Sequence, residues 1–168
     1  MSANDPRPPE FTYSRVFDAP RRLVWAAHSE ADRLKHWWGP KGCKVSVKQF
    51  EFRPGGIFHY SMNYSTGNMM WGRFFYREIV AGERIAWLNS FATEGGGIAR
   101  APMSQDCPLE MNNIMTLAEE AGKTTLTLHS VPFGANAQEN KFFADLKSSM
   151  QQGFGGTYDQ LAAYLSTA

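Results

Sequence analysis

The side chains best suited to acid–base or metal chemistry are four histidines, and they are scattered along the chain. Acid–base catalysis and metal binding both need several such groups brought to one place. The strand alternation around His59 puts that side chain on the polar, solvent-facing side of its strand. We therefore interpret all four as surface histidines that take no part in catalysis, namely His28, His36, His59 and His129.

The two cysteines also lack the spacing of a chemical site. Cys43 and Cys107 are far apart, with no CxxC or Cys/His pattern of a zinc site, so we expect reduced, unligated thiols. The chain contains no nucleophile elbow with a Ser/His/Asp order, no HExxH, no P-loop and no GxGxxG after a strand. The sequence thus predicts no catalytic residue set, no metal and no cofactor.

One enzymatic alternative stays open, because a cyclase or dehydratase needs little more than a shaped pocket with one or two polar groups. In that case the proton-transfer or orienting residues would be Tyr60, Tyr64, Arg73 and Asn113.

Composition limits the classes of protein that remain. The chain has 168 residues, 43% of them hydrophobic, which is enough for the core of one domain. Seventeen basic and sixteen acidic residues give a net charge of +1 without any basic block, which argues against nucleic-acid binding. No stretch approaches the roughly 18 apolar residues of a membrane span, and no secretory leader is recognisable. We expect a disordered tail over residues 1–9 and a single cytoplasmic domain over 10–168.

The elements that must position any site begin with a strand over 11–17. Asp18 and Pro20 then predict the start of a helix over 20–29, with Asp18 as its N-cap. A second short helix over 30–37 carries Leu34, Trp37 and Trp38 toward the core before Gly39-Pro40 ends it.

Between residues 43 and 131 the pattern becomes that of five or six strands in an antiparallel meander, with turns at 54–56, 65–68, 81–82 and 122. A change of parity predicts a β-bulge near Lys48 or Gln49. Residues 93–108 have no hydrophobic periodicity and predict a long loop, which in a compact domain is usually functional or mobile.

After Val131 an apolar stripe with spacings of three and four predicts one long helix, formed by Phe142, Leu146, Met150, Phe154, Tyr158, Leu161 and Leu165. Gly153, Gly155 and Gly156 interrupt this helix, and each costs on the order of 1 kcal/mol relative to Ala. Either the helix kinks there, or the glycines leave room for a neighbouring backbone or a ligand.

This order of elements resembles the START-like superfamily, also called SRPBCC, which includes polyketide cyclases and plant pollen allergens. Five segments are similar, more narrowly, to the family of the activator of heat-shock protein 90 ATPase: DAPRRLVWAAHSEADRLKHWWGPKG at 18–42, EFRPGG at 51–56, REIVAGERI at 77–85, GKTTLTL at 122–128 and GGTYDQLAAYL at 155–165. The resemblance implies an α+β helix-grip fold, in which a curved antiparallel sheet of six to seven strands surrounds a long C-terminal helix, with two short helices after strand one.

The resemblance further implies a hydrophobic cavity between the sheet and the last helix, which would bind an apolar small molecule of lipid, polyketide or aromatic type. The residues expected to bind it are Trp37, Phe58, Tyr60, Met62, Met70, Phe74, Trp87, Asn113, Met115, Phe154 and Tyr158, with Asn89 and Leu117 also facing the helix. The same pattern would serve a filled core without any cavity.

A third alternative is a protein-interaction module, by analogy with the co-chaperone that activates heat-shock protein 90. It is disfavoured because no exposed apolar stripe is evident, and because the chaperone activator has a further N-terminal domain. Homodimerisation through the 93–108 loop or a sheet edge stays open.

Overall fold

The computed structural model of the protein describes residues 7–167. Most of the predicted disordered tail lies outside the described residues. Among the described residues, no helix is long and apolar enough to cross a membrane, and no group of three His, Cys, Asp or Glu side chains is placed to hold a metal ion.

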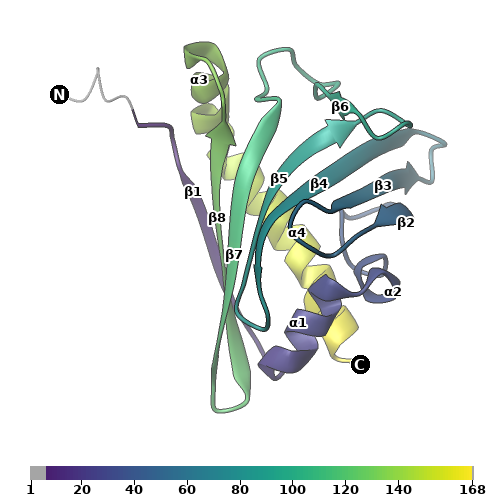
Figure 1. The fold of residues 1–168 in the computed structure, drawn as a ribbon, viewed down its shortest axis with the longest axis vertical. Helices are drawn as coiled ribbons and strands as arrows, with labels where there is room; N and C mark the ends of the chain where they lie inside the picture. The colour runs from purple at the N-terminus through teal and green to yellow at the C-terminus, as the bar shows by residue number, and fades with distance from the viewer. Residues whose placement is uncertain (1–6, 168) are drawn as a thin grey trace.

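One antiparallel sheet forms the body of the molecule (Figure 1). Its order is β1-β8-β7-β5-β4-β3-β2, with the short β6 paired to β5. The strands are β1 (Phe11–Phe17), β2 (Cys43–Phe50), β3 (Ile57–Tyr64), β4 (Met69–Val80), β5 (Arg84–Ala92), β6 (Ile98–Ala99), β7 (Glu110–Glu120) and β8 (Lys123–Phe133). The four predicted turns all lie between consecutive strands, which confirms the meander.

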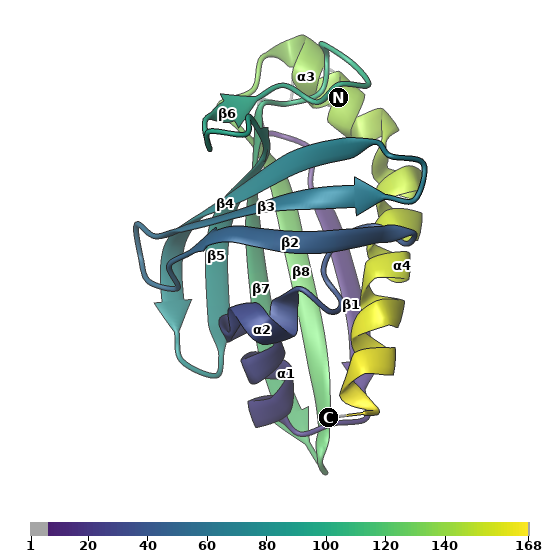
Figure 2. The same ribbon diagram turned by 90° about the vertical axis from the view of Figure 1, so that its right-hand side faces the viewer.

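The helices are α1 (Arg21–Ser29), α2 (Ala31–Leu34), α3 (Ala137–Asp145) and α4 (Lys147–Leu165). The sheet bends so that β2, β3 and β4 run across the direction of β1, β7 and β8, and α4 lies along the hollow side (Figure 2). This arrangement confirms the predicted helix-grip fold.

Two bulges lie in the strands of the bent part of the sheet, and one tight reversal joins β2 to β3. The register of β2 against β3 shifts between Val47 and Gln49, which confirms the predicted bulge. A second shift lies between Tyr76 and Glu78 on β4. In the EFRPGG reversal Gly55 has a φ of 84°, and a Cβ on Gly56 would collide with the carbonyl oxygen of Glu51. Only glycine fits there, so this turn sets the register of β3.

Three details of the helices differ from the predictions. The second helix, predicted over 30–37, ends at Leu34, and residues 35–37 form a turn. Pro20, and not Asp18, is the N-cap of α1, so the proline lies one position before the helix. One long C-terminal helix was predicted, but the structure has two, α3 and α4, because the helix is interrupted at Leu146. Asn136 and Glu139 form a capping box that starts α3 separately. The break lets α3 contact β8 while α4 contacts β1 and α1. By contrast, α4 continues unbroken through its three glycines.

Two of the four histidines are buried, which corrects their assignment to the surface. His28 is 7% exposed and His59 is 2% exposed. The ring of His28 packs against that of Trp37, with centroids 4.8 Å apart. His59 does lie on the outer face of β3, but the 93–97 segment folds over it, and its Nε2 is 3.0 Å from the carbonyl oxygen of Thr93. Strand alternation correctly predicted that His59 faces outward, but it did not predict that residues 93–97 bury this side chain.

Candidate functional site

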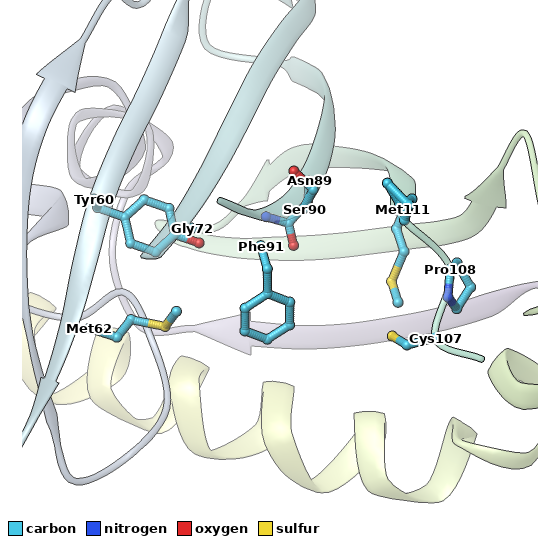
Figure 3. A pocket seen from close by; sticks show the side chains of 10 residues that line it. Tyr60, Met62, Gly72, Asn89, Ser90, Phe91, Cys107, Pro108 and Met111 are labelled. Carbon is cyan, nitrogen blue, oxygen red and sulfur yellow. The ribbon is translucent and has the colours of Figure 1, made fainter. Parts of the chain in front are cut away.

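Two adjoining chambers lie on the hollow side of the sheet. Chamber one has a volume of about 160 Å³ and is bounded by the sheet and residues 107–109 (Figure 3). Chamber two has a volume of about 230 Å³ and is bounded by the sheet, residues 38–40 and α4. The chambers share three lining residues, Tyr60, Met62 and Asn89.

Both chambers have mainly apolar walls. Chamber one is lined by Tyr60, Met62, Gly72, Asn89, Ser90, Phe91, Cys107, Pro108, Leu109 and Met111. Chamber two is lined by Trp38, Gly39, Pro40, Tyr60, Met62, Asn89, Met150, Gly153, Phe154 and Thr157. Phe91 and Met111 project from the sheet toward the helix below (Figure 3).

A glycine on the neighbouring strand sets the position of the Tyr60 ring. Tyr60 on β3 pairs with Gly72 on β4. A Cβ at position 72 would lie 2.5 Å from the phenolic oxygen of Tyr60, so the ring lies directly across the glycine. A strand glycine often marks such a close approach. Gly72 therefore makes the space that holds the Tyr60 phenol where the chambers meet.

The titratable side chains that line the chambers are Tyr60 and Cys107. Burial raises the pKa of Tyr60 to about 12, and hydrogen bonds from the Trp38 and Asn89 side chains only partly oppose this. Burial likewise raises the pKa of the Cys107 thiol. Both groups are thus neutral at pH 7. Among the residues that the structure describes, no Asp, Glu, Lys, Arg or His lines either chamber.

The structure brings three of the predicted binding residues to the chambers: Tyr60, Met62 and Phe154. Asn89, which was expected to face the helix, lines both. Met70 lies elsewhere, beside a separate open hollow of about 440 Å³ next to the turn between β3 and β4.

The other seven predicted residues are packed in the core, at most 4% exposed, and line neither chamber: Trp37, Phe58, Phe74, Trp87, Asn113, Met115 and Tyr158. Ring stacking fills this region. Phe74 and Trp87 have centroids 4.9 Å apart, and Trp37 and Tyr158 have centroids 5.8 Å apart. The space between sheet and helix is filled near α1, as the filled-core alternative anticipated, and open near residues 107–109.

Periodicity missed the loop residues of the walls. Cys107, Pro108 and Leu109 lie at the end of the long loop, where no repeat pattern says which side chains point inward. The only available signal was the length of that loop. Gly153 did carry a signal, since it lines chamber two and a Cβ there would meet nothing within 4 Å. Gly156 instead faces Lys41, whose side chain would lie 3.5 Å from a Cβ at position 156.

Cationic side chains hold the long loop in place. Lys48 Nζ donates to the Glu94 carbonyl oxygen at 2.6 Å, and an Arg73 N–H donates to that of Gly96 at 3.0 Å. Arg100 donates to the Cys107 carbonyl oxygen at 2.8 Å and to the Glu139 carboxylate on α3 at 2.7 Å. Because Cys107 lines chamber one, the Arg100 contacts position part of its wall.

Comparison with known protein families gives one match over most of the chain. The family described as activator of Hsp90 ATPase homolog 1-like protein matches residues 18–166. The comparison with curated proteins returned no match.

Several solved structures share the fold. A protein from Arthrobacter aurescens is 24% identical, with a TM-score of 0.79 over 95% of this chain and 87% of that one. The AHSA1 protein from Silicibacter pomeroyi is 17% identical, with a TM-score of 0.70 over 95% of this chain and 99% of that one. DynU16, from the dynemicin biosynthetic locus, is 19% identical, with a TM-score of 0.64 over 94% of this chain and 47% of that one.

Proposed function

The chain belongs to the family of activator of Hsp90 ATPase homolog 1-like proteins, and from that premise we propose that it binds an apolar small molecule between its sheet and α4. The observation that carries the proposal is the pair of adjoining chambers with mainly apolar walls. Small-molecule sites are typically concave and apolar, with a few polar groups that orient the ligand. Here Tyr60 and Asn89 are such polar groups.

Chamber chemistry favours holding a molecule over converting it. General acid–base catalysis works best with a group whose pKa lies near the operating pH. Burial raises the pKa values of Tyr60 and Cys107, so both pKa values lie further above pH 7 than usual. We therefore propose binding as the main activity and keep a cyclase or dehydratase reaction as the alternative for the same space.

A co-chaperone-like interaction would need no internal space. A protein-interaction module does not require the two chambers, whereas a small-molecule binding protein does. The chambers therefore favour the small-molecule proposal. The similarity to DynU16 does not indicate which ligand this chain binds, because at 19% identity it concerns the fold alone.

The first test is native mass spectrometry of the protein purified from its own host, followed by thermal-shift measurements with flavonoids, polycyclic aromatics and fatty acids. A ligand that binds only the folded state stabilises it by about 2.7 kcal/mol at a hundred times its Kd. We expect a co-purifying apolar molecule or a concentration-dependent rise in Tm. If the mass spectrum shows no added mass and no compound raises the Tm, the result would favour the interaction-module alternative over small-molecule binding.

Gly153→Leu gives a sharper form of this test. The leucine side chain would enter chamber two, where Gly153 leaves open space, so we expect the ligand affinity derived from the thermal shifts to fall at least tenfold. Gly155→Leu is the matched control, because it lies on the same helix in open space and lines neither chamber. Each change should stabilise α4 by on the order of 1 kcal/mol. Equal ligand binding by the two variants would contradict a ligand in chamber two.

A further inference from the structure

The walls of both chambers are uncharged throughout the described part of the chain. An ionised carboxylate or ammonium that leaves water for such a place loses its hydration and finds no opposite charge. Both chambers open to water, so this cost applies to a charged group held deep in a chamber, beside the buried Tyr60, and not to one at the opening beside the exposed Pro40 and Gly153. The deep walls therefore select against ions.

The cations beside the chambers already contact carboxylates, although Lys41 and Arg15 share a single one. Lys41, which follows the lining residue Pro40, donates from Nζ to the Asp159 carboxylate at 3.2 Å, and Arg15 donates to the same carboxylate at 2.7 Å. On the side of chamber one, Arg100 pairs with Glu139 at 2.7 Å. A ligand carboxylate on the side of Arg100 would have to displace an existing ion pair. One that reached Lys41 would lie at an exposed site, where such a contact contributes only about 0–1 kcal/mol.

The polar groups that both chambers share lie where the chambers meet. The Tyr60 hydroxyl is neutral, and its oxygen already accepts hydrogen bonds from the Trp38 and Asn89 side chains, so its own O–H is the donor left for a ligand. Asn89 Nδ2 also donates to the Arg73 carbonyl oxygen at 3.1 Å. Ser90 and Thr157 line one chamber each, and Thr157 Oγ1 is committed to the Gly39 carbonyl oxygen at 3.0 Å. A molecule that extends into both chambers meets Tyr60 and Asn89 with its middle and not with its end.

We infer that the molecule bound between the sheet and α4 is uncharged and carries a hydrogen-bonding oxygen near its middle, which contacts Tyr60 and Asn89. A ring ketone or a phenol has this form, whereas a fatty-acid anion carries its charge at one end. Phe91 in chamber one, and Trp38 and Phe154 in chamber two, provide apolar faces for the rest of such a molecule. This inference rests on the proposed function.

The test compares three probes with the same rigid three-ring frame: fluorene, 9-fluorenone, which adds a central ketone, and fluorene-9-carboxylate, which adds a central charge. Affinities are measured by isothermal titration calorimetry at pH 7.5 on the full chain. We expect fluorenone to bind most tightly, fluorene about tenfold more weakly, and the carboxylate not measurably, because one neutral hydrogen bond separates the first two.

Tyr60→Phe removes the hydroxyl and keeps the ring across Gly72. We expect it to weaken fluorenone binding about five- to tenfold and to leave fluorene binding unchanged. Tyr76→Phe is the matched control, since Tyr76 is equally buried on the adjacent strand and lines neither chamber; it should change neither affinity.

The outcomes separate this inference from the function on which it rests. If fluorene and fluorenone bind equally well and Tyr60→Phe changes nothing, the function stands and the inference is overturned. Tightest binding of the carboxylate overturns the inference in the same way. If none of the three probes binds the wild-type protein, the inference is overturned, and the proposed function is then decided by the mass spectrometry and thermal-shift measurements above.

Discussion

At the scale of single residues, His28 shows how tertiary packing changes a side chain's chemistry. Its Nδ1 lies 2.8 Å from the Val24 carbonyl oxygen one helical turn earlier, which indicates that Nδ1 carries the proton. Burial lowers the pKa of His28 to about 4, and the hydrogen bond to Val24 opposes this only partly. The imidazole is therefore neutral in the folded protein at pH 7.

This shift predicts that acid destabilises the protein. The unfolded chain binds a proton at His28 below about pH 6.5, and the folded chain does so only near pH 4, so the free energy of unfolding falls as the pH drops between these values. We expect His28 to account for a loss of about 2 kcal/mol between pH 7.5 and pH 5. Urea unfolding at both pH values measures it.

His28→Asn is the control, because its amide keeps an N–H donor near the position of Nδ1 and does not titrate in this range. The variant should be less stable than the wild type at pH 7.5, but its stability should depend less on pH. An identical pH dependence in both proteins would show that His28 is not the group responsible.

At the scale of elements, the long loop and α3 are linked by one arginine. Arg100 donates to the carbonyl oxygens of Gln105 and Cys107 and pairs with Glu139, whose side chain is largely buried. Glu139 also belongs to the capping box of α3. The guanidinium thus connects the start of a helix to a wall of chamber one.

Arg100→Met should loosen that wall. It leaves two carbonyl oxygens and a largely buried carboxylate without their partner, which should cost about 1–3 kcal/mol of stability. Hydrogen exchange should speed up over residues 100–108 while the centres of β7 and β8 stay protected.

Arg84→Met is the matched control, since Arg84 pairs with Glu78 at an exposed site where such a bond contributes about 0–1 kcal/mol. Unchanged exchange over 100–108 in the Arg100 variant would show that the loop is held by its other contacts, such as those of Lys48 and Arg73 with Glu94 and Gly96.

At the scale of the whole molecule, the space under the sheet has a filled end and an open end. Met115 on β7 is fully buried in the filled end, whereas Met111 on the same face of the same strand lines chamber one. Stability and ligand binding should consequently depend on different ends of one strand.

The same substitution at the two positions tests this division. Met115→Ala should cost about 2–5 kcal/mol of stability, because it leaves a cavity in packed surroundings, and should leave ligand affinity nearly unchanged. Met111→Ala should cost about 1 kcal/mol and weaken binding severalfold, because it removes part of the chamber wall. Chemical denaturation and calorimetry with 9-fluorenone measure both effects. The opposite pattern would contradict the division.

Local patterns were sufficient to predict the order of the elements, and the family resemblance implied their helix-grip arrangement. Alternation and turn residues placed all the strands except the two-residue β6, which lies within the predicted loop over 93–108. The parity change placed the bulge after Val47, and a turn was predicted at 54–56. These features depend on neighbours along the chain, where the period of side-chain direction is determined by backbone geometry. The family resemblance rested on the same segments, and the family match covers residues 18–166.

Only the tertiary structure decided which inward-facing residues enclose space. Tyr60 and Phe58 share one strand face, yet Tyr60 borders both chambers while Phe58 is packed among other rings. The break at Leu146 and the 93–97 cover over His59 were equally invisible to periodicity. A pattern along the chain says which way a side chain points, but whether it meets a partner or a void depends on residues far away in sequence, and these are brought together only by folding.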